Sequence, residues 1–226
     1  MNSENHKTAV LWTGGKDCCL ALHNVVQRGG RVDFLVTFAP ANPQFLAHPL
    51  AVMKAQAQSL GIEHLVMQVS EPFGEGYRDA IRSLRDGRCV GTLVTGDIDL
   101  VGGLPNWIVE CCEGLEVAVE MPLWNRPREG LMAELLDGGY EVVMSLVKPP
   151  LTESWVGRRL DRQCVAELRQ LHRDTGLDIC GENGEYHSLV LDGPAFSHRI
   201  HLDWQPASRD GMWFMQISGS SDNGSQ

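Results

Sequence analysis

The chain has 226 residues, of which 43% are hydrophobic and 21% are charged, and its formal net charge is −10 with a sequence pI of about 5.2. This composition is globular and allows one large domain or a domain with a small appendage. The acidic balance argues against a broad nucleic-acid-binding surface, which needs clustered lysines and arginines. No apolar run approaches the ~18 residues that a membrane-spanning helix requires.

Seven cysteines stand at positions 18, 19, 89, 111, 112, 164 and 180. They form no CxxC pair, and an odd number with two adjacent pairs makes a poor disulfide framework. We therefore expect buried free thiols in a reducing compartment, and hence a cytoplasmic protein. The polar stretch at residues 1–7 carries no apolar core behind basic residues, so no signal peptide is expected.

The first half of the chain alternates between short apolar runs and amphipathic stretches. Five strands are predicted, at Thr8–Trp12, Val32–Phe38, Glu63–Val69, Thr92–Thr95 and Glu116–Val119. Four helices are predicted between them, from Leu20 to the Gly29-Gly30 pair and at Pro49–Leu60, Tyr77–Arg85 and Asn106–Cys112. Strands that alternate with helices predict an α/β fold with a parallel sheet covered on both faces.

The second half is predicted to be smaller and of mixed α+β type. The expected elements are a helix from Pro127 to Leu136, a strand at Tyr140–Val147, a charged helix at Asp161–Thr175, and late strands near Leu189–Leu191, His198–Leu202 and Met212–Ile217. We place a first domain at residues 1–121 and a C-terminal part at residues 122–219. Disordered tails are expected at residues 1–7 and 220–226, with a Ser, Asn and Gly composition from Ser218 onward.

The most informative stretch runs from Leu11 to Cys19, reads LWTGGKDCC, and joins the first strand to the first helix. The glycines at positions 14 and 15 let the backbone come close to a ligand, and a helix start offers unpaired N–H groups and the positive end of the dipole. Lys16 adds a full positive charge at the same place. The pattern favours a phosphate site, and the alternative is an ordinary strand–helix turn.

This stretch is not the common P-loop, which needs a glycine where Val10 stands and a Ser or Thr where Asp17 stands. It resembles the PP-loop, S-G-G-x-D-S/T, of ATP pyrophosphatases, which cut ATP between the α and β phosphates. Thr13 matches the first Ser of that motif, Gly14 and Gly15 its glycines, and Cys18 its last Ser or Thr. Because a thiol is a weak donor, Cys18 is either a phosphate-site thiol of lowered pKa or a buried inert one.

Ligands of open parallel sheets bind at the carboxyl ends of the strands. Three loops are therefore expected to converge, at Thr13–Cys18, Thr37–Asn42 and Gly96–Asp99. The second loop, with Phe38 and Ala39, would face the adenine and ribose of a nucleotide. In the third loop, Asp97 either binds Mg²⁺ beside the phosphates or caps the next helix.

A second group of polar residues lies near the end of the chain, where Glu182, Glu185 and His187 surround an Asn183-Gly184 turn just before a strand. A turn this short crowds two carboxylates and an imidazole together, which suits proton transfer or a metal. The alternative is an acidic surface turn that leads into a β-strand.

Four blocks of the chain, taken in order, resemble the diphthine–ammonia ligase family. They are the PP-loop, Gly96-Asp97-Ile98, Pro122-Leu123-Trp124-Asn125-Arg126, and the stretch from Gly181 to Pro194, which reads GENGEYHSLVLDGP. The resemblance covers residues 8–194, and its last block is the most specific. Asn183 and His187 place the chain closer to a G-E-N-G-E-Y/F-H branch of that family, and the segment from Asp99 to Gly103 departs from the family's S-x-Y-Q-R pattern.

The resemblance implies a Rossmann-like adenine nucleotide α-hydrolase fold, of the HUP type, with a PP-loop ATP-binding domain and an acceptor-binding C-terminal part. It implies a ligase that uses ATP and Mg²⁺ to adenylate a carboxylate, releases pyrophosphate, and lets ammonia or an amine displace AMP. The residues that the resemblance implies in catalysis are Lys16, Asp17, Glu182, Glu185 and His187. Those that it implies at the nucleotide are residues 13–18, Phe38, Ala39, Gly96 and Asp97. Those that it implies at the acceptor are Trp124, Arg126, Asn183 and Gly184.

Two other functions remain open from the residues. A PP-loop sulfur transferase acting on tRNA or a small molecule would need paired cysteines in separate loops or a CxxC zinc site, a pattern that Cys111, Cys112 and Cys180 do not form. A non-catalytic ATP-binding sensor would not need the Glu182–His187 block. No membrane or nucleic-acid partner is expected, and homo-oligomer formation is left open.

Overall fold

The computed structural model describes residues 6–100 and 106–221. By their contacts these residues form two compact units, and each unit is described by itself. The first unit takes its described residues from Met1–Thr13, Asp17–Pro43 and Ile62–Trp124. The second takes its described residues from Gly14–Lys16, Gln44–Gly61 and Asn125–Gln226.

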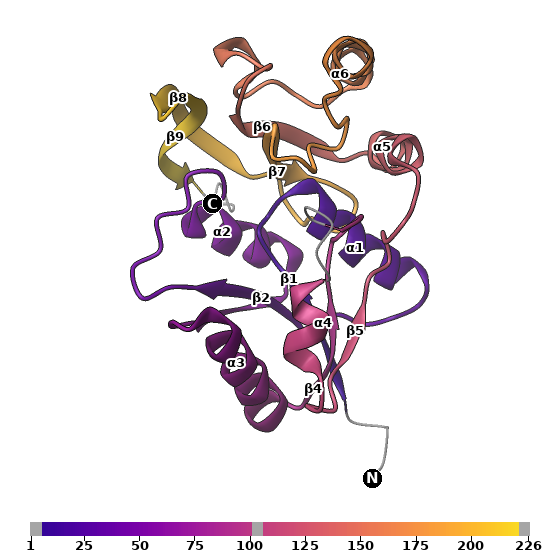
Figure 1. Cartoon of the computed structure of the whole chain (residues 1–226), viewed down its shortest axis with the longest axis vertical. Helices are drawn as coiled ribbons and strands as arrows, with labels where there is room; N and C mark the ends of the chain where they lie inside the picture. The colour runs from indigo at the N-terminus through magenta and orange to yellow at the C-terminus, as the bar shows by residue number, and fades with distance from the viewer. Residues whose placement is uncertain (1–5, 101–105, 222–226) are drawn as a thin grey trace. The chain divides into compact units, whose positions relative to one another are not determined.

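The first unit is built on a five-stranded parallel sheet with the strand order β3-β2-β1-β4-β5 (Figure 1). Its strands are β1 (Lys7–Leu11), β2 (Phe34–Ala39), β3 (Glu63–Gln68), β4 (Val90–Val94) and β5 (Ala118–Glu120). The predicted parallel α/β sheet is therefore confirmed. Lys7 begins β1, so the predicted N-terminal tail is wrong at this residue, and its first five residues lie outside the described ones.

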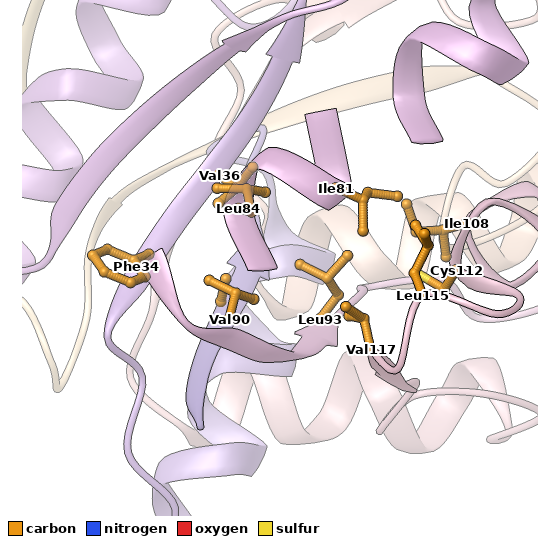
Figure 2. Packing of buried hydrophobic residues seen from close by; sticks show 11 residues of the cluster. Phe34, Val36, Ile81, Leu84, Val90, Leu93, Ile108, Cys112, Leu115 and Val117 are labelled. Carbon is orange, nitrogen blue, oxygen red and sulfur yellow. The ribbon is translucent and has the colours of Figure 1, made fainter. Parts of the chain in front are cut away.

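The helices of this unit are α1 (Lys16–Gln27), α3 (Phe73–Arg88) and α4 (Trp107–Cys112), with Lys16 itself grouped in the second unit. Helices α3 and α4 pack on one face of the sheet, where their apolar side chains meet those of the strands (Figure 2). Val10, Leu35 and Val94 are also buried, and they alternate along their strands with the residues of that face. Both faces of the sheet are therefore covered, as predicted.

Helix α3 runs from Phe73 to Arg88 and is longer than the predicted Tyr77–Arg85. Its first turn contains Gly74 and Gly76. A side chain at Gly76 could not be accommodated, since a Cβ atom there would lie 2.2 Å from the carbonyl oxygen of Ser70. Gly74 and Gly76 thus lie inside the helix.

The second unit contains an antiparallel sheet with the strand order β7-β6-β9-β8 (Figure 1). Its strands are β6 (Glu141–Val147), β7 (Tyr186–Asp192), β8 (His201–Arg209) and β9 (Met212–Ser221). Its helices are α2 (Leu50–Leu60), α5 (Arg128–Asp137) and α6 (Arg162–Thr175), with a short 3₁₀ turn at Glu153–Trp155.

The last two strands differ from the prediction. Strand β8 begins at His201 rather than His198, and β9 continues to Ser221, so the expected disorder from Ser218 is wrong as far as Ser221. Asp210 and Gly211 both have positive φ, at 52° and 75°, which is the conformation of a tight hairpin turn. That turn pairs β8 with β9 along their full lengths.

The division of the chain by contacts differs from a single boundary at residue 121. Helix α2 and residues 14–16 belong with the C-terminal part, although they come early in the sequence. The physical reason is a set of long-range hydrogen bonds: the Gln56 amide donates to the carbonyl oxygens of both Gly14 (2.9 Å) and Val190 (2.7 Å).

Candidate active site

The loop after β1 has the conformation that its glycines permit. Gly14 has a φ of +77°, and a Cβ atom there would lie 2.2 Å from Oε1 of Gln56. Helix α1 begins immediately afterwards, at Lys16. The loop therefore requires glycine at position 14 for both its conformation and its contact with the buried Gln56 side chain.

The carboxyl ends of three adjacent parallel strands meet in the first unit. The Thr37 hydroxyl, near the end of β2, donates to the carbonyl oxygen of Trp12 at 2.6 Å. Gly96, just after β4, lies so close to the start of α1 that a Cβ atom there would be 2.6 Å from the carbonyl carbon of Asp17. The three loops that were expected to converge are thus brought together by the strand order.

The remaining side chains of the PP-loop differ in exposure. Thr13 is exposed, Asp17 is half-buried and Cys18 is buried in the first turn of α1. The Cys18 thiol lies 3.7 Å from the Thr13 hydroxyl. The two motif positions that carry a hydroxyl in related PP-loops are therefore in contact with each other across the loop.

Asp97 is held by its neighbours in the first unit. Its Oδ2 atom accepts hydrogen bonds from the Thr95 hydroxyl (2.7 Å) and the Asn106 amide (2.6 Å). Asn106 in turn caps α4 by accepting from the Ile108 N–H at 3.1 Å. Asp97 is therefore not the cap of α4, which was the alternative role predicted for it. It instead orients Asn106, which is the cap.

Phe38 and Ala39 lie in β2 and not in the predicted loop, and Phe38 contributes an aromatic group to the first unit. The ring of Phe38 stands edge-on to those of Tyr77 and Trp107, with centroids 5.3 and 6.4 Å away, and Trp107 is 44% exposed. Ala39 is buried next to it at the end of β2. These rings give the predicted adenine side of the site an aromatic surface.

In the second unit, the glycine-rich loop lies against the start of β7. The Lys16 N–H donates to the Ser188 hydroxyl at 3.1 Å, and the Val190 N–H donates to the Gly14 carbonyl at 3.0 Å. The Lys16 ammonium lies 5.4 Å from the centroid of the Tyr186 ring, and the residue is only 5% exposed. Lys16 and the GENGEYHS stretch are thus neighbours, although the Lys16–Ser188 bond spans 172 positions of the chain.

The turn before β7 is organised by Glu185, which is 8% exposed. Its carboxylate accepts from the N–H groups of Asp178 (2.8 Å) and Asn183 (3.1 Å) and from the Asn183 amide (3.2 Å). A carboxylate with these partners stabilises the turn, whereas Glu182 is half-buried and Asn183 is exposed. The arrangement favours a positioning role for Glu185 over the predicted catalytic one.

His187 lies where several cations approach it. Burial, and then the positive charges of Lys148 and Lys16, lower its pKa below the ordinary value of 6.5. Its Nδ1 atom is 3.4 Å from Nε2 of His48, which precedes α2. A Cβ atom on Gly184 would lie 3.5 Å from the Lys148 ammonium, so this lysine reaches the turn as well.

Trp124 and Arg126 belong to different units. Trp124 belongs to the first unit and is half-buried, with its N–H bonded to the Met121 carbonyl at 3.1 Å. Arg126 belongs to the second unit and forms an ion pair with Glu134 of α5. The acceptor role predicted for these two residues stays a prediction.

A cavity of about 360 Å³ lies in the second unit, beside the segment that carries His48. It is lined by Phe45, Leu46, Pro49, Ala207, Ser208, Arg209, Phe214, Gln216 and Ile217. The cavity combines an apolar wall with one cationic side chain, and none of its residues was singled out from the sequence.

Two family models match the chain. The diphthamide synthase N-terminal domain matches residues 6–118, and the diphthamide synthase C-terminal domain matches residues 127–220. The chain belongs to the diphthamide synthase family. The resemblance read from the PP-loop and from the GENGEYHS stretch is thereby confirmed.

Relatives in the diphthamide synthase family carry the name diphthine–ammonia ligase. The protein from Danio rerio is 24% identical over 223 residues, covering 85% of this chain and 85% of its own. The human protein is 25% identical over 226 residues, covering 87% of this chain and 83% of its own. The name is that of an amide-forming ligase, the class of enzyme that the sequence predicts.

Among solved structures, a predicted subunit of a tRNA methyltransferase from Methanocaldococcus jannaschii is similar over 83% of this chain and 97% of its own. Its identity is 17% and its TM-score is 0.46, so this likeness supports no conclusion. Within residues 6–100 and 106–221, no helix has the length and apolar character needed to cross a membrane.

The residues of the loop fit the phosphates of the nucleotide that this family uses. A left-handed glycine, a buried lysine and the first turn of the 12-residue α1 lie in direct succession, which is a donor set for phosphate oxygens. A metal is less well provided for, since no group of three or more His, Cys, Asp or Glu in the described part of the chain could hold one. Magnesium needs only one or two carboxylates when phosphates complete its shell, so a site at Asp97 stays a proposal.

Three further residues of the site were not predicted as such. Gln56, His48 and Lys148 reach it from α2, from the segment before α2 and from the end of β6. None of them belongs to a local motif, because each acts through a partner more than 30 positions away. Ser188 belongs to the GENGEYHS stretch, but its hydrogen bond to Lys16 could not be predicted from the sequence, because the two residues are 172 positions apart.

Proposed function

We propose that this protein is an ATP-dependent ligase that converts a carboxylate into an amide, with diphthine or a closely similar carboxylate as acceptor and ammonia as nitrogen donor. The observation that carries the proposal is the bond between the Lys16 N–H and the Ser188 hydroxyl. Within the second unit it joins Lys16 of the phosphate loop to β7, directly after the Glu182–His187 turn.

In the first half-reaction, an acceptor carboxylate oxygen attacks the α-phosphorus of ATP and pyrophosphate leaves. Negative charge develops on the phosphate oxygens, and fixed donors aimed at that charge lower the barrier. Lys16 and the N–H groups at the start of α1 supply such donors. Asp17 and Cys18 lie in the first turn of α1 and are proposed to hold the loop.

Magnesium, when bound, would neutralise charge on the phosphates that Lys16 does not reach. Asp97 is the proposed ligand, because it lies next to Gly96 and so beside the first turn of α1 in the first unit. Its present partners, Thr95 and Asn106, would keep one carboxylate oxygen oriented.

In the second half-reaction, ammonia attacks the carbonyl carbon of the acyl adenylate, a C–N bond forms, and the C–O bond to AMP breaks. The nitrogen must lose one proton, and His187 is the proposed acceptor of it. Glu182 would orient the ammonia, and Glu185 would hold the turn. The cavity beside residues 45–49 offers room for the rest of the acceptor.

The proposal is tested with purified protein, ATP, Mg²⁺, ammonium and the diphthine-bearing acceptor. The expected result is one AMP, one pyrophosphate and one amide for each ATP consumed, with ¹⁵N from ammonium in the product. A protein that binds ATP and never turns it over would be a sensor, and sulfur incorporated from a sulfur donor would indicate a transferase. Either result would overturn the proposal.

A further inference from the structure

His187, which belongs to the GENGEYHS stretch, pairs with His48, which does not belong to any of the motifs described above. Their rings are perpendicular, at 89°, with centroids 5.3 Å apart, and Nε2 of His48 is 3.4 Å from Nδ1 of His187. His187 is the second residue of β7, while His48 precedes α2, 139 positions earlier in the chain. Both belong to the second unit.

The pairing of strands in the second sheet explains why His48 lies beside His187. Leu146 of β6 is directly opposite His187 of β7 on one side and Phe214 of β9 on the other. Residues that are directly opposite in neighbouring strands point to the same face. Ala47 packs on Leu146 and Phe214, so the next residue, His48, is held beside His187 by buried apolar contacts.

The segment is also fixed on its other side. Helix α2 follows directly, and its buried Gln56 bonds to the carbonyl oxygens of Gly14 and Val190. The position of His48 is therefore set by packing before it and by hydrogen bonds after it. An imidazole in such a place can determine which ring nitrogen of its partner carries the proton.

Two cations act on His187. Lys16 lies at the start of α1 and Lys148 directly after β6, and the acidic Glu182–Glu185 turn precedes β7 in the chain. The two ammonium groups oppose a positive charge on the imidazole. His187 is consequently neutral at physiological pH, and the position of its one proton decides what it can do.

We propose that His48 is a positioning residue for the amide-forming step. Its Nε2 accepts a hydrogen bond from Nδ1–H of His187, which leaves Nε2 of His187 unprotonated to receive a proton from the attacking ammonia. This inference rests on the proposed function. When the C–N bond forms and AMP leaves with the electrons of the broken C–O bond, one N–H proton passes to Nε2 of His187. The resulting imidazolium keeps its Nδ1–H bond to His48, as in other catalytic bases oriented by a third group.

The bound nucleotide should strengthen this base. Lys16, which opposes the charge on His187, also belongs to the phosphate loop, so phosphates beside it would offset part of its field. The pKa of His187 should therefore rise when AMP or a non-hydrolysable ATP analogue binds. The residue would become more basic only in the complex that needs it.

The first test measures the His187 imidazole by ¹⁵N NMR and uses no acceptor. In the wild-type protein we expect the Nδ1–H tautomer, with its pKa raised by AMP. His48→Leu should lose the tautomer preference, and His48→Gln, whose side-chain oxygen can still accept a hydrogen bond, should keep it. An Nε2–H tautomer in the wild type, or no change in His48→Leu, would overturn the inference.

The second test follows amide formation against pH. His48→Leu should lower kcat by ~10- to 10²-fold and move the acidic limb of the profile, with ATP affinity unchanged. His48→Gln should restore most of the rate, and the exposed His201→Leu serves as the control. A wild-type protein that makes no amide would contradict the proposed function, while the tautomer measurement would still decide the role of His48.

Discussion

The two buried charges of the candidate site have different surroundings. Glu185 accepts three hydrogen bonds, one from the Asp178 N–H and two from Asn183 of its own turn, so its desolvation is offset by the protein itself. Lys16 lies at a helix start beside the Tyr186 ring, in a loop whose shape suits a phosphate. The hydrogen bonds of Glu185 therefore favour a role in the architecture of the turn, and the phosphate-binding role of Lys16 stays a prediction.

Replacing Lys16 by Ala should weaken ATP binding by ~10- to 10²-fold, because a charge-assisted hydrogen bond contributes about 1.5–3 kcal/mol. Isothermal titration calorimetry measures the effect. Lys54, an exposed lysine of α2, provides the matched control, and Lys54→Ala should leave the affinity unchanged. Equal affinities for the two variants, with the fold intact, would exclude Lys16 from the phosphate site.

Glu185→Gln should destabilise the protein by about 1–3 kcal/mol, because the amide would turn a donor toward the N–H groups of Asp178 and Asn183. Urea denaturation measures this loss, and the half-buried Glu182→Gln is the comparison variant, with little expected change. Unaltered stability in Glu185→Gln together with a ~10²-fold loss of product would instead support the general-base role predicted from the sequence.

At the scale of elements, the site depends on how closely strand ends approach the start of α1. Gly96, after β4, touches the backbone of Asp17 and Cys18, with a hypothetical Cβ only 2.6 and 2.7 Å from their atoms. Backbone atoms cannot move aside as a flexible side chain can. Helix α1 can therefore hold its position only if residue 96 has no side chain.

Gly96→Ala should displace the first turn of α1 and weaken ATP binding by ~10-fold or more, since small misplacements of positioning groups are costly. Gly87→Ala in α3 is the control: nothing lies within 4 Å of a Cβ there, and alanine should stabilise the helix by up to ~1 kcal/mol. Calorimetry and thermal unfolding of both variants check this. Normal ATP affinity in Gly96→Ala would show that the contact is not needed.

The face of the second sheet gives a prediction about the acceptor. Ala207→Phe would fill part of the 360 Å³ cavity and should raise the KM for the acceptor while leaving ATP affinity unchanged. Initial rates at varied acceptor concentration provide the measurement. An unchanged KM would place the acceptor elsewhere in the protein.

For the whole molecule, His187 links stability to pH. Burial, Lys148 and Lys16 lower its folded-state pKa below the unfolded value of 6.5, so the unfolded chain takes up the proton first as the pH falls. The contribution of this residue to stability is thus present above pH 6.5 and is lost as the pH drops through that value toward the folded-state pKa.

The stability of the wild-type protein should therefore fall more between pH 7.5 and pH 5 than that of His187→Gln. Urea denaturation of both proteins at several pH values gives the difference. Identical pH dependence would mean that His187 does not carry the lowered pKa.

How much the sequence revealed differs between local and long-range features. The alternation of apolar runs predicted every strand of the first sheet, because burial on both faces leaves a local pattern. The buried free thiols were also predicted well: five of the seven cysteines are buried and all seven are free, with Cys89 exposed. Missed details, such as the glycines inside α3 and the Asp210-Gly211 hairpin, depended on backbone contacts or conformations.

The sequence by itself determined the parallel sheet and the family, because each rests on residue types at fixed local spacing. The phosphate-binding role of residues 13–18 stays a prediction. Only the tertiary structure decided that Glu185 holds its own turn, that Asn106 rather than Asp97 caps α4, and that Lys16 bonds to Ser188. It also brought His48 to His187 across 139 positions. Such pairings depend on hydrogen bonds and packing between distant segments, and these leave no periodicity in the chain for a sequence to show.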